Sequence, residues 1–218
     1  MTYKILGWIL CSSILLTNCQ SRQSAVFQLL PPEQTGIHFA NTIVENDSLN
    51  VIDYAYLYNG GGVGVGDVNN DGLDDIFFAG NQVSSRLYLN RGELQFDDIT
   101  EAAGAITSRW ATGVAMVDIN QDSWLDIYIC VASKFDSTLS RNYFFINQGV
   151  NEEGVPTFID QAAAFNLNDA GYSTQATFFD YDLDGDLDMY LLTNGMEEFN
   201  HNLAREKNTN GEGISTDK

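Results

Sequence analysis

The chain has 218 residues, of which 44% are hydrophobic and 12% aromatic, so it has enough apolar side chains to form a globular domain. It carries 30 acidic and 10 basic residues, and its formal net charge is -20. This balance argues against nucleic acid as a partner, because binding phosphate requires clusters of lysine and arginine, and it suits either cation binding or plain solubility.

The first nineteen residues predict an export signal. The apolar stretch from Ile5 to Leu16 is too short for a transmembrane helix, which needs about 20 residues, and it is typical of a signal-peptide core. It ends in the sequence LTNC, residues 16–19, which resembles a bacterial lipobox. The resemblance implies removal of residues 1–18 and lipid modification of Cys19, which would anchor the exported protein to the bacterial envelope, at the outer membrane or cell surface. Ordinary cleavage and secretion is the alternative.

The cysteines do not predict a disulfide framework. Cys11 and Cys19 both lie in the first nineteen residues, and Cys130 lies within the apolar run IYICVA. With the leader removed and Cys19 lipidated, Cys130 has no partner within the chain. We therefore expect Cys130 to be a buried free thiol that acts as a small hydrophobic side chain.

An acidic segment recurs three times along the chain. The copies are DVNNDGLDDI at 67–76, DINQDSWLDI at 118–127 and DYDLDGDLDM at 180–189, with apolar runs on both sides. Further along, RLYLNRG at 86–92 matches NYFFINQG at 142–149, and FDDITEAAG at 96–104 matches FIDQAAAF at 158–165. Short apolar runs rich in Val, Ile, Phe and Tyr predict strands, and four of them in a period of about 50 residues predict a β-propeller blade.

We therefore expect an all-β fold, a partial β-propeller with about two complete four-stranded antiparallel blades and an incomplete third. The expected boundaries are 53–104 for blade 1, 105–166 for blade 2 and 167–195 for the start of blade 3. Residues 19–52 are expected to form a linker or arm, in which TGIHFANTI at 35–43 would supply an outer strand to the blade that closes the propeller.

The final segment, 196–218, is polar and is expected to be a flexible tail. Propellers close with about 4–8 blades, and the third unit stops before its third strand. We therefore expect the chain to be the N-terminal piece of a longer protein. A complete small protein with a disordered tail is the alternative.

Oxygen-bearing residues alternate along the three acidic loops, and glycine holds the sixth position in two of them. Alternating oxygens in a tight loop can all turn toward one centre, as in loops of the D-x-[DN]-x-D-G type that bind calcium. The predicted ligands are the side chains of Asp67, Asn69, Asp71 and Asp75 with the Leu73 carbonyl, those of Asp118, Asn120, Asp122 and Asp126 with the Trp124 carbonyl, and those of Asp180, Asp182, Asp184 and Asp188 with the Asp186 carbonyl.

Calcium is the predicted cofactor because all the ligands are hard oxygens, with no cysteine or histidine nearby. Carboxylates that converge at ~4 Å repel by about 4 kcal/mol per pair at an effective dielectric constant of 20, so we expect the loops to open without a cation. An EF-hand is the competing motif, but its twelfth position requires glutamate in a helix, and here it holds Phe78, Ile129 and Leu191, all in predicted strands. Acidic turns that bind nothing are the plain alternative.

The three units resemble FG-GAP repeats, also called VCBS repeats, which occur in the propeller head of integrin α subunits and in many bacterial surface proteins. The resemblance covers about Tyr54 to Gly195 and rests on the acidic loops and on the LYLNRG…FDDITEAAG segment, which is similar to the repeat region of secreted proteins that carry an ASPIC/UnbV domain. It implies calcium in the loop that joins the first two strands of each blade, and a mainly structural and binding role. Ser123, in place of glycine, is the one departure.

Signatures of an enzyme are sparse. The histidines are His38 and His201, which lie outside the repeats, and no serine has a G-x-S-x-G setting. The run NGGGVGVGD lacks the lysine of a phosphate-binding loop and predicts close packing of inner strands instead. We therefore expect a non-catalytic calcium-binding propeller segment of a surface lipoprotein, for adhesion or recognition of a protein or glycan. Part of a polysaccharide lyase or hydrolase, with its catalytic residues outside this chain, is the alternative.

Overall fold

A computed structural model describes residues 27–132 and 139–194. The leader, Cys19 and the segment from 195 onward lie outside the described residues, so the predictions about them stay predictions. The chain divides into two compact units, Met1–Pro31 and Pro32–Lys218. Residues 27–31 of the first unit contain no helix or strand, and the fold below is that of the second unit.

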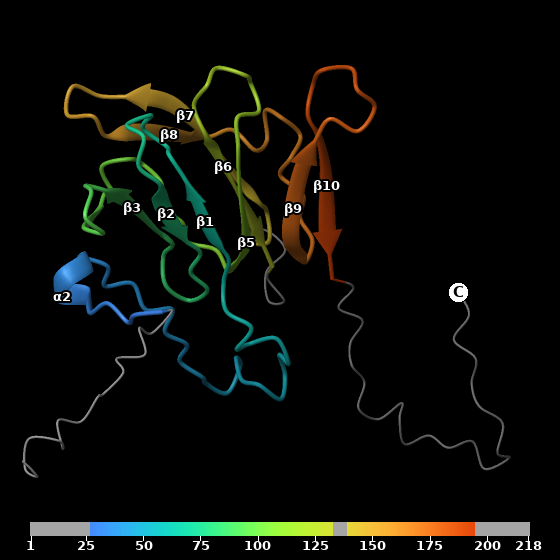
Figure 1. Ribbon diagram of the computed structural model, residues 1–218. Coiled ribbons are helices and arrows are strands. Elements are labelled where there is room, and N and C mark those ends of the chain that lie inside the picture. Colours follow the sequence, from blue (N-terminus) through green and yellow to red (C-terminus); the bar gives the residue numbers. More distant parts are fainter. Residues whose placement is uncertain (1–26, 133–138, 195–218) are drawn as a thin grey trace, which may run out of the picture. The chain divides into compact units, whose positions relative to one another are not determined.

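The described residues of the second unit form three antiparallel sheets (Figure 1). Blade 1 consists of β1 (Val63–Gly66), β2 (Asp75–Phe78), β3 (Arg86–Asn90) and β4 (Phe96–Asp98), in that spatial order. Blade 2 consists of β5 (Ala111–Val117), β6 (Asp126–Val131), β7 (Tyr143–Val150) and β8 (Pro156–Asp160), and blade 3 of β9 (Ser173–Phe179) and β10 (Asp188–Thr193). Two four-stranded sheets and one two-stranded sheet confirm the predicted all-β fold of partial propeller blades.

Each acidic loop closes the first hairpin of its blade. The strands pair so that the residue before the loop faces the last aspartate of the loop, and this aspartate opens the second strand. The pairs are Gly66 with Asp75, Val117 with Asp126, and Phe179 with Asp188. The sequence spacing is therefore a hairpin geometry, with the turn long enough to wrap around a centre.

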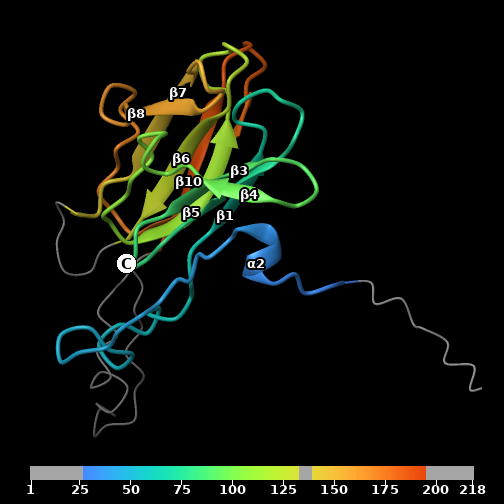
Figure 2. The ribbon, with the colours of Figure 1, turned by 90° about the vertical axis from the view of Figure 1, so that its left-hand side faces the viewer.

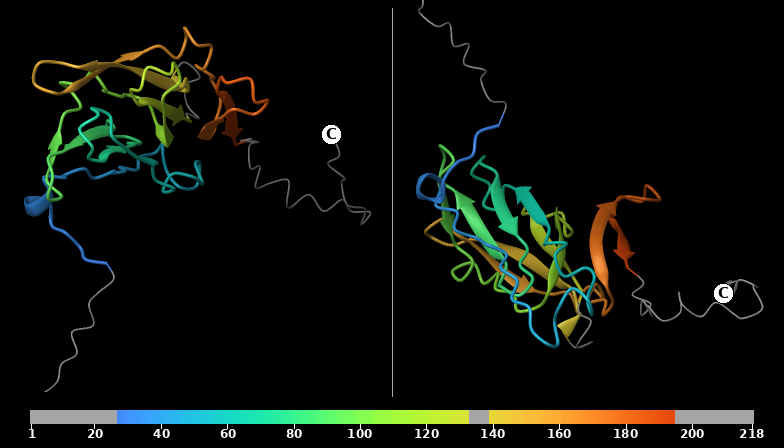
Figure 3. Two further views of the ribbon diagram at one scale, coloured as in Figure 1. Left: turned by 45° about the horizontal axis from the view of Figure 1, so that its top comes forward. Right: turned by 90° about the horizontal axis from the view of Figure 1, so that it is seen from below.

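The inner strands β1, β5 and β9 lie side by side, which brings the three sheets together (Figure 3). The Thr112 hydroxyl donates a hydrogen bond to the Ser173 carbonyl over 2.7 Å, which joins blade 2 to blade 3. A Cβ atom at Gly62 would lie 2.9 Å from the Val114 nitrogen, and one at Gly113 would overlap the Thr174 carbonyl oxygen. Close packing of the glycine run against the next blade, as predicted, is confirmed at Gly62.

Two apolar layers hold the blades together, and β6 belongs to both. Phe77 and Leu87 of blade 1 pack against Ile127 and Ile129 of blade 2, and all four are fully buried. The opposite face of β6 presents residues that pack toward blade 3. These residues are Tyr128 and Cys130, which cluster with Phe144, Ala176, Phe178, Met189 and Leu191. A strand buried on both faces explains the continuous apolar run IYICV, since neither set of side chains meets water.

Cys130 is 1% exposed and forms no disulfide. Burial raises the pKa of its thiol to about 12, so the side chain is neutral at physiological pH. The prediction of a buried free cysteine is confirmed.

The N-terminal arm differs from its predicted form. Thr35 ends the single-turn helix α2 (Pro32–Thr35), which lies beside blade 1 in Figures 1 and 2, and residues 36–45 form no strand. The arm instead covers a face of blade 1, where the Phe39 ring stacks on Phe78 with 5.2 Å between centroids. The predicted strand at 35–43 is therefore wrong, because side-chain contact with the sheet face replaces backbone pairing at a sheet edge.

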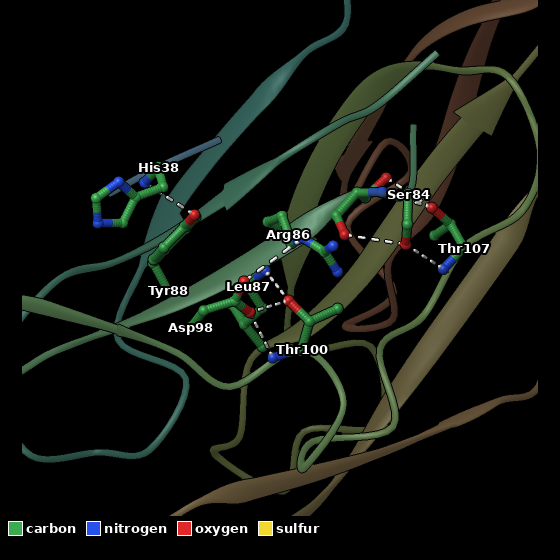
Figure 4. Close-up of polar contacts among 9 residues, drawn as sticks. His38, Ser84, Arg86, Leu87, Tyr88, Asp98, Thr100 and Thr107 are labelled. Carbon is green, nitrogen blue, oxygen red and sulfur yellow. Dashed lines mark hydrogen bonds and ion pairs between the residues drawn. The ribbon is translucent and has the colours of Figure 1, made fainter. Parts of the chain in front are cut away.

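The turn after β4 is tied back to β3 by polar contacts (Figure 4). The Leu87 N–H donates to the Thr100 hydroxyl over 2.9 Å, and the Thr100 N–H and hydroxyl donate to Asp98 over 3.0 and 2.6 Å. Asp160 has the same place in blade 2, where it accepts from the Phe144 and Ala162 N–H groups. These contacts explain why the FDD and FID segments match in the sequence.

Among the described residues, no helix has the length and apolar character needed to cross a membrane.

Candidate metal centre

The first aspartate of each acidic loop holds the loop closed through backbone hydrogen bonds. Its carboxylate accepts N–H groups from the residues that follow the loop's tip. These bonds run from Asp71 and Gly72 to Asp67 (3.2 and 2.8 Å), from Asp122 and Ser123 to Asp118 (3.0 and 2.8 Å), and from Gly185 to Asp180 (3.1 Å). The three loops therefore share one scaffold, which is set by the first aspartate.

The aspartate at the fifth position of each loop shapes the second half of that loop. Its carboxylate accepts the N–H group two residues later, from Leu73, Trp124 and Asp186, over 2.9, 2.9 and 3.1 Å. The residue between has a left-handed backbone, with φ of 87° at Gly72, 73° at Ser123 and 95° at Gly185. Ser123 thus adopts the bend that glycine adopts most easily, and the second loop keeps the shape of the other two.

The last aspartate is the buried anchor of the first two loops. Asp75 and Asp126 are both fully buried. Asp75 accepts N–H groups from Val68 and Asn90 over 2.9 and 2.8 Å, and Asp126 accepts them from Ile119 and Asn147 over 3.1 and 2.8 Å. Burial raises the pKa of each carboxyl to about 6, although the two N–H groups oppose this shift.

Sequence reasoning missed two residues that support these anchors, Asn90 in β3 and Asn147 in β7. Each gives its backbone N–H to the buried aspartate, and each side-chain amide donates to a carbonyl of an acidic loop: Asn90 to Asp74 over 2.9 Å, and Asn147 to Leu125 over 3.1 Å. The signal was present, because both asparagines hold the same place in the matched LNRG and INQG segments.

The third loop differs because β10 has no third strand beside it within the described residues. Asp188 accepts the Tyr181 N–H over 2.9 Å and is exposed, unlike Asp75 and Asp126. The Asp180 Oδ1 atom is buried and has no hydrogen-bond partner. Asp180, Asp182 and Asp188 place ligand oxygens within 4.8 Å of one another, the single group of this kind in the described part of the chain.

These oxygens fit a metal ion, since a buried carboxylate oxygen without a donor is costly and a cation would satisfy it. The hydrogen bond and charge of Asp184 raise the pKa of Asp186, an exposed residue of the same loop. The corresponding carboxylates of the first two loops accept backbone N–H groups and do not gather to the same distance within the described residues. Coordination by the carbonyls of Leu73, Trp124 and Asp186 stays a prediction.

The twelfth position of each loop decides against an EF-hand. Phe78 lies in β2, Ile129 in β6 and Leu191 in β10, so no glutamate or helix is available there. A β-hairpin, whose internal hydrogen bonds are shared by all three loops, therefore presents the acidic residues.

Residues 67–129 match the family model of the FG-GAP-like repeat. The FG-GAP-like repeat begins at Asp67, the first residue of the first acidic loop, and ends at Ile129 in β6, so it includes two of the three loops. The third loop, whose scaffold repeats theirs, lies beyond the matched span. No curated protein matches the chain.

The buried anchors predict an unusual pH dependence in the absence of divalent cations. The folded-state pKa of Asp75 and Asp126 is about 6, against an ordinary value of 3.8, so folding takes up protons between these values. The contribution of these two carboxyls to the free energy of unfolding is complete below their ordinary pKa of 3.8, and it is lost as the pH rises through about 6. We therefore expect these carboxyls to add less to the free energy of unfolding at neutral pH than at about pH 4.5, as measured by urea unfolding in the presence of a chelator.

The double variant Asp75→Asn, Asp126→Asn isolates this effect because neither side chain can then titrate. Its free energy of unfolding should lose the part of the pH dependence between about pH 4 and 6. Asp74→Asn removes an exposed carboxylate from the same loop and serves as the control. If the double variant follows the same pH profile as the control, the buried anchors do not carry the dependence.

Proposed function

We propose that the chain is a calcium-binding β-propeller segment of a surface lipoprotein, which recognises a protein or glycan and does not catalyse a reaction. The observation that carries the proposal is the third loop, where Asp180, Asp182 and Asp188 bring ligand oxygens within 4.8 Å of one another. The scaffold shared with the other two loops supports the same role in all three blades.

The donor set favours calcium over other metals. Carboxylate and carbonyl oxygens are hard ligands, which calcium accepts in sets of about 6–8 with flexible geometry. Magnesium needs near-ideal octahedral geometry and retains water, so a ring of oxygens along one loop suits it less well. Bound calcium would neutralise the repulsion among the gathered carboxylates.

Neighbouring loops are tied to each other, which supports a structural role. The Asn70 amide donates to the Ser123 carbonyl over 3.0 Å, and the Gln121 amide donates to the Gly185 carbonyl over 2.8 Å. The fourth residue of one loop thus reaches the sixth residue of the next. We propose that ordering one loop therefore orders its neighbour, and that occupied loops stiffen the array of blades.

A recognition role fits the way the loop acids are used. The carboxylates of Asp67, Asp75, Asp118 and Asp126 all accept backbone N–H groups, and this use holds them in place rather than leaving them to act on a substrate. The adhesive or recognising surface would then lie elsewhere on the blades, with the loops as its support.

Calcium should raise the thermal midpoint of the chain, and a chelator should lower it again. A ligand that binds the folded state alone adds about 2.7 kcal/mol at a concentration one hundred times its dissociation constant. Calorimetric titration of the double variant Asp180→Asn, Asp188→Asn should show fewer bound calcium ions than the parent chain. An equal midpoint in calcium and in chelator would count decisively against the proposal.

Asp186→Asn is the matched control for this experiment. Asp186 is exposed in the same loop, and only its backbone carbonyl is a predicted ligand, so neutralising its side chain should keep the number of bound ions. A loss equal to that of the double variant would mean that general negative charge, and not a defined site, attracts the ion.

We propose that Cys19 anchors the protein to the envelope, on the basis of the LTNC segment. Cys19→Ser should abolish incorporation of a labelled fatty acid and move the protein from the membrane fraction to the soluble fraction. Retention of the label in the variant would refute the anchor.

A further inference from the structure

A second feature lies at the opposite end of the inner strands from the acidic loops. The loops follow the C-terminal ends of β1, β5 and β9, at the top of Figure 1, whereas the segment that leads into β1 lies below them. A pocket of about 200 Å³ opens at this lower end. It is lined by residues that precede β1, by residues before and within β5 and β9, and by Ala132 and Asn194, which follow β6 and β10. It is separate from every residue of the candidate metal centre.

The pocket is lined by aromatic rings from three parts of the chain. Tyr54 and Tyr56 come from the segment before β1, Trp110 precedes β5, and Tyr172 precedes β9. The Tyr54 ring meets Trp110 edge-on at 5.7 Å and Tyr56 edge-on at 6.2 Å between centroids. These contacts hold the rings at fixed angles, so the lining is formed before any ligand arrives.

The segment that carries the two tyrosines is itself held against blade 1. Tyr54 is 6% exposed, and its N–H donates to the Asn50 carbonyl over 2.9 Å. Leu57 is fully buried, and a Cβ atom at Gly61 would overlap the Ala79 carbonyl oxygen. The position of this wall of the pocket is therefore set by packing.

The polar groups of the lining are neutral. Asn59 and Asn194 contribute amides, and no lining residue carries a charge. The Thr112 and Thr174 hydroxyls are engaged with the carbonyls of Ser173 and Leu192. The remaining polar side chains form no side-chain hydrogen bond with another described residue, and they are those of Tyr54, Tyr56, Tyr172, Trp110, Asn59 and Asn194. The pocket therefore offers hydrogen-bonding groups that a ligand could engage.

We propose that this pocket binds one neutral sugar ring, such as the terminal unit of a glycan. The apolar face of a sugar ring packs on aromatic side chains, and its hydroxyls take hydrogen bonds from amide, indole and phenol groups. The volume is below the about 300–1,000 Å³ of pockets for drug-sized ligands, which favours a single ring. The inference deepens the proposed recognition of a glycan and rests on that function.

The net charge of the chain argues against an acidic ligand, and the lining argues against a cationic one. An acidic sugar would meet no cation in the lining and would approach a protein with a net charge of -20. A quaternary ammonium group also packs on aromatic rings, but the lining offers no carboxylate to pair with it. The unengaged amides and hydroxyls favour a ligand with many hydroxyl groups.

The test is ligand-observed NMR on the full chain in calcium, with methyl glycosides of glucose, galactose, mannose and N-acetylglucosamine as neutral probes. Glucuronate and choline are the charged probes. We expect at least one neutral glycoside to bind, and Trp110→Ala to weaken its binding by about tenfold or more. Tyr190→Ala removes an exposed aromatic side chain of β10 that lies outside the lining and outside the acidic loops, and it should leave binding unchanged.

Asn59→Ala is a second variant, which keeps the test valid if Trp110→Ala fails to fold. Asn59 is exposed, so its side chain can be removed without unfolding the protein, and binding should weaken several-fold. Binding of choline or glucuronate alone, or of no probe at about 10 mM, would overturn the sugar assignment. Calcium binding measured on the same samples separates the two proposals. If calcium binds and no sugar does, the pocket assignment fails while the metal proposal stands.

Discussion

Asn147→Leu should destabilise the protein by about 3–5 kcal/mol, because two buried polar groups and one half-buried carbonyl lose their partner together. The Asn147 amide donates to the Val68 carbonyl over 2.8 Å and to the Leu125 carbonyl over 3.1 Å, and its oxygen accepts the Gly149 N–H over 2.9 Å. Asn147 is 2% exposed, so water cannot take its place. Urea unfolding in saturating calcium measures the change.

The equivalent variant in blade 1, Asn90→Leu, is the matched control. Asn90 is half-buried, its amide donates to the Asp74 carbonyl in an exposed loop, and its oxygen accepts the Gly92 N–H over 2.9 Å. None of these groups is fully buried, so water can replace most of what is lost. We expect a loss of about 1 kcal/mol there. Equal losses at the two positions would show that the bond from β7 to the blade 1 loop at Val68 contributes little.

Gly113→Ala should destabilise the protein by about 3 kcal/mol, at the upper end of the range for overpacking. The new Cβ atom would overlap the Thr174 carbonyl oxygen and would lie 2.5 Å from the Gln175 Oε1 atom. The first of these neighbours is the backbone of β9, which cannot rotate away, so blade 3 must move as a whole. Thermal unfolding and urea unfolding should both report the loss.

Gly171→Ala tests whether any added methyl group near β9 has this effect. A Cβ atom at Gly171 would lie 2.9 Å from the Asp169 carboxylate, the far end of a flexible side chain. The expected change is within about 0.5 kcal/mol. If the Gly113→Ala and Gly171→Ala variants were equally stable, the close contact between β5 and β9 at Gly113 would not be required for stability.

The hairpins and their acidic loops could be predicted because the chemistry is local. Alternating oxygens, a bend at the sixth position and an apolar strand on each side all lie within about ten residues, as in Asp67 to Ile76. The burial of Cys130 followed in the same way from its apolar neighbours. Local spacing and periodicity carry this information directly.

Features that depend on distant partners could not be predicted from the sequence. Asn147 acts on Val68, 79 residues away, and the burial of Asp75 depends on β3 lying beside it. The arm at 36–45 has the composition of a strand, yet Phe39 finds an aromatic partner on the face of blade 1. The contrast between Asp188 and Asp126 likewise arises from a neighbouring strand and not from the loop itself, since the two loops have nearly the same pattern.

The side-chain hydrogen bonds between loops all run the same way, from one loop to the next loop along the chain. Asn70 and Gln121 each reach forward with an amide to the next loop, and the two side chains differ in length by one methylene group. Leu183 holds the same place in the third loop, where it is 86% exposed and offers only hydrocarbon. Leucine has no amide to donate, so this kind of tie cannot be continued by the fourth residue of the third loop.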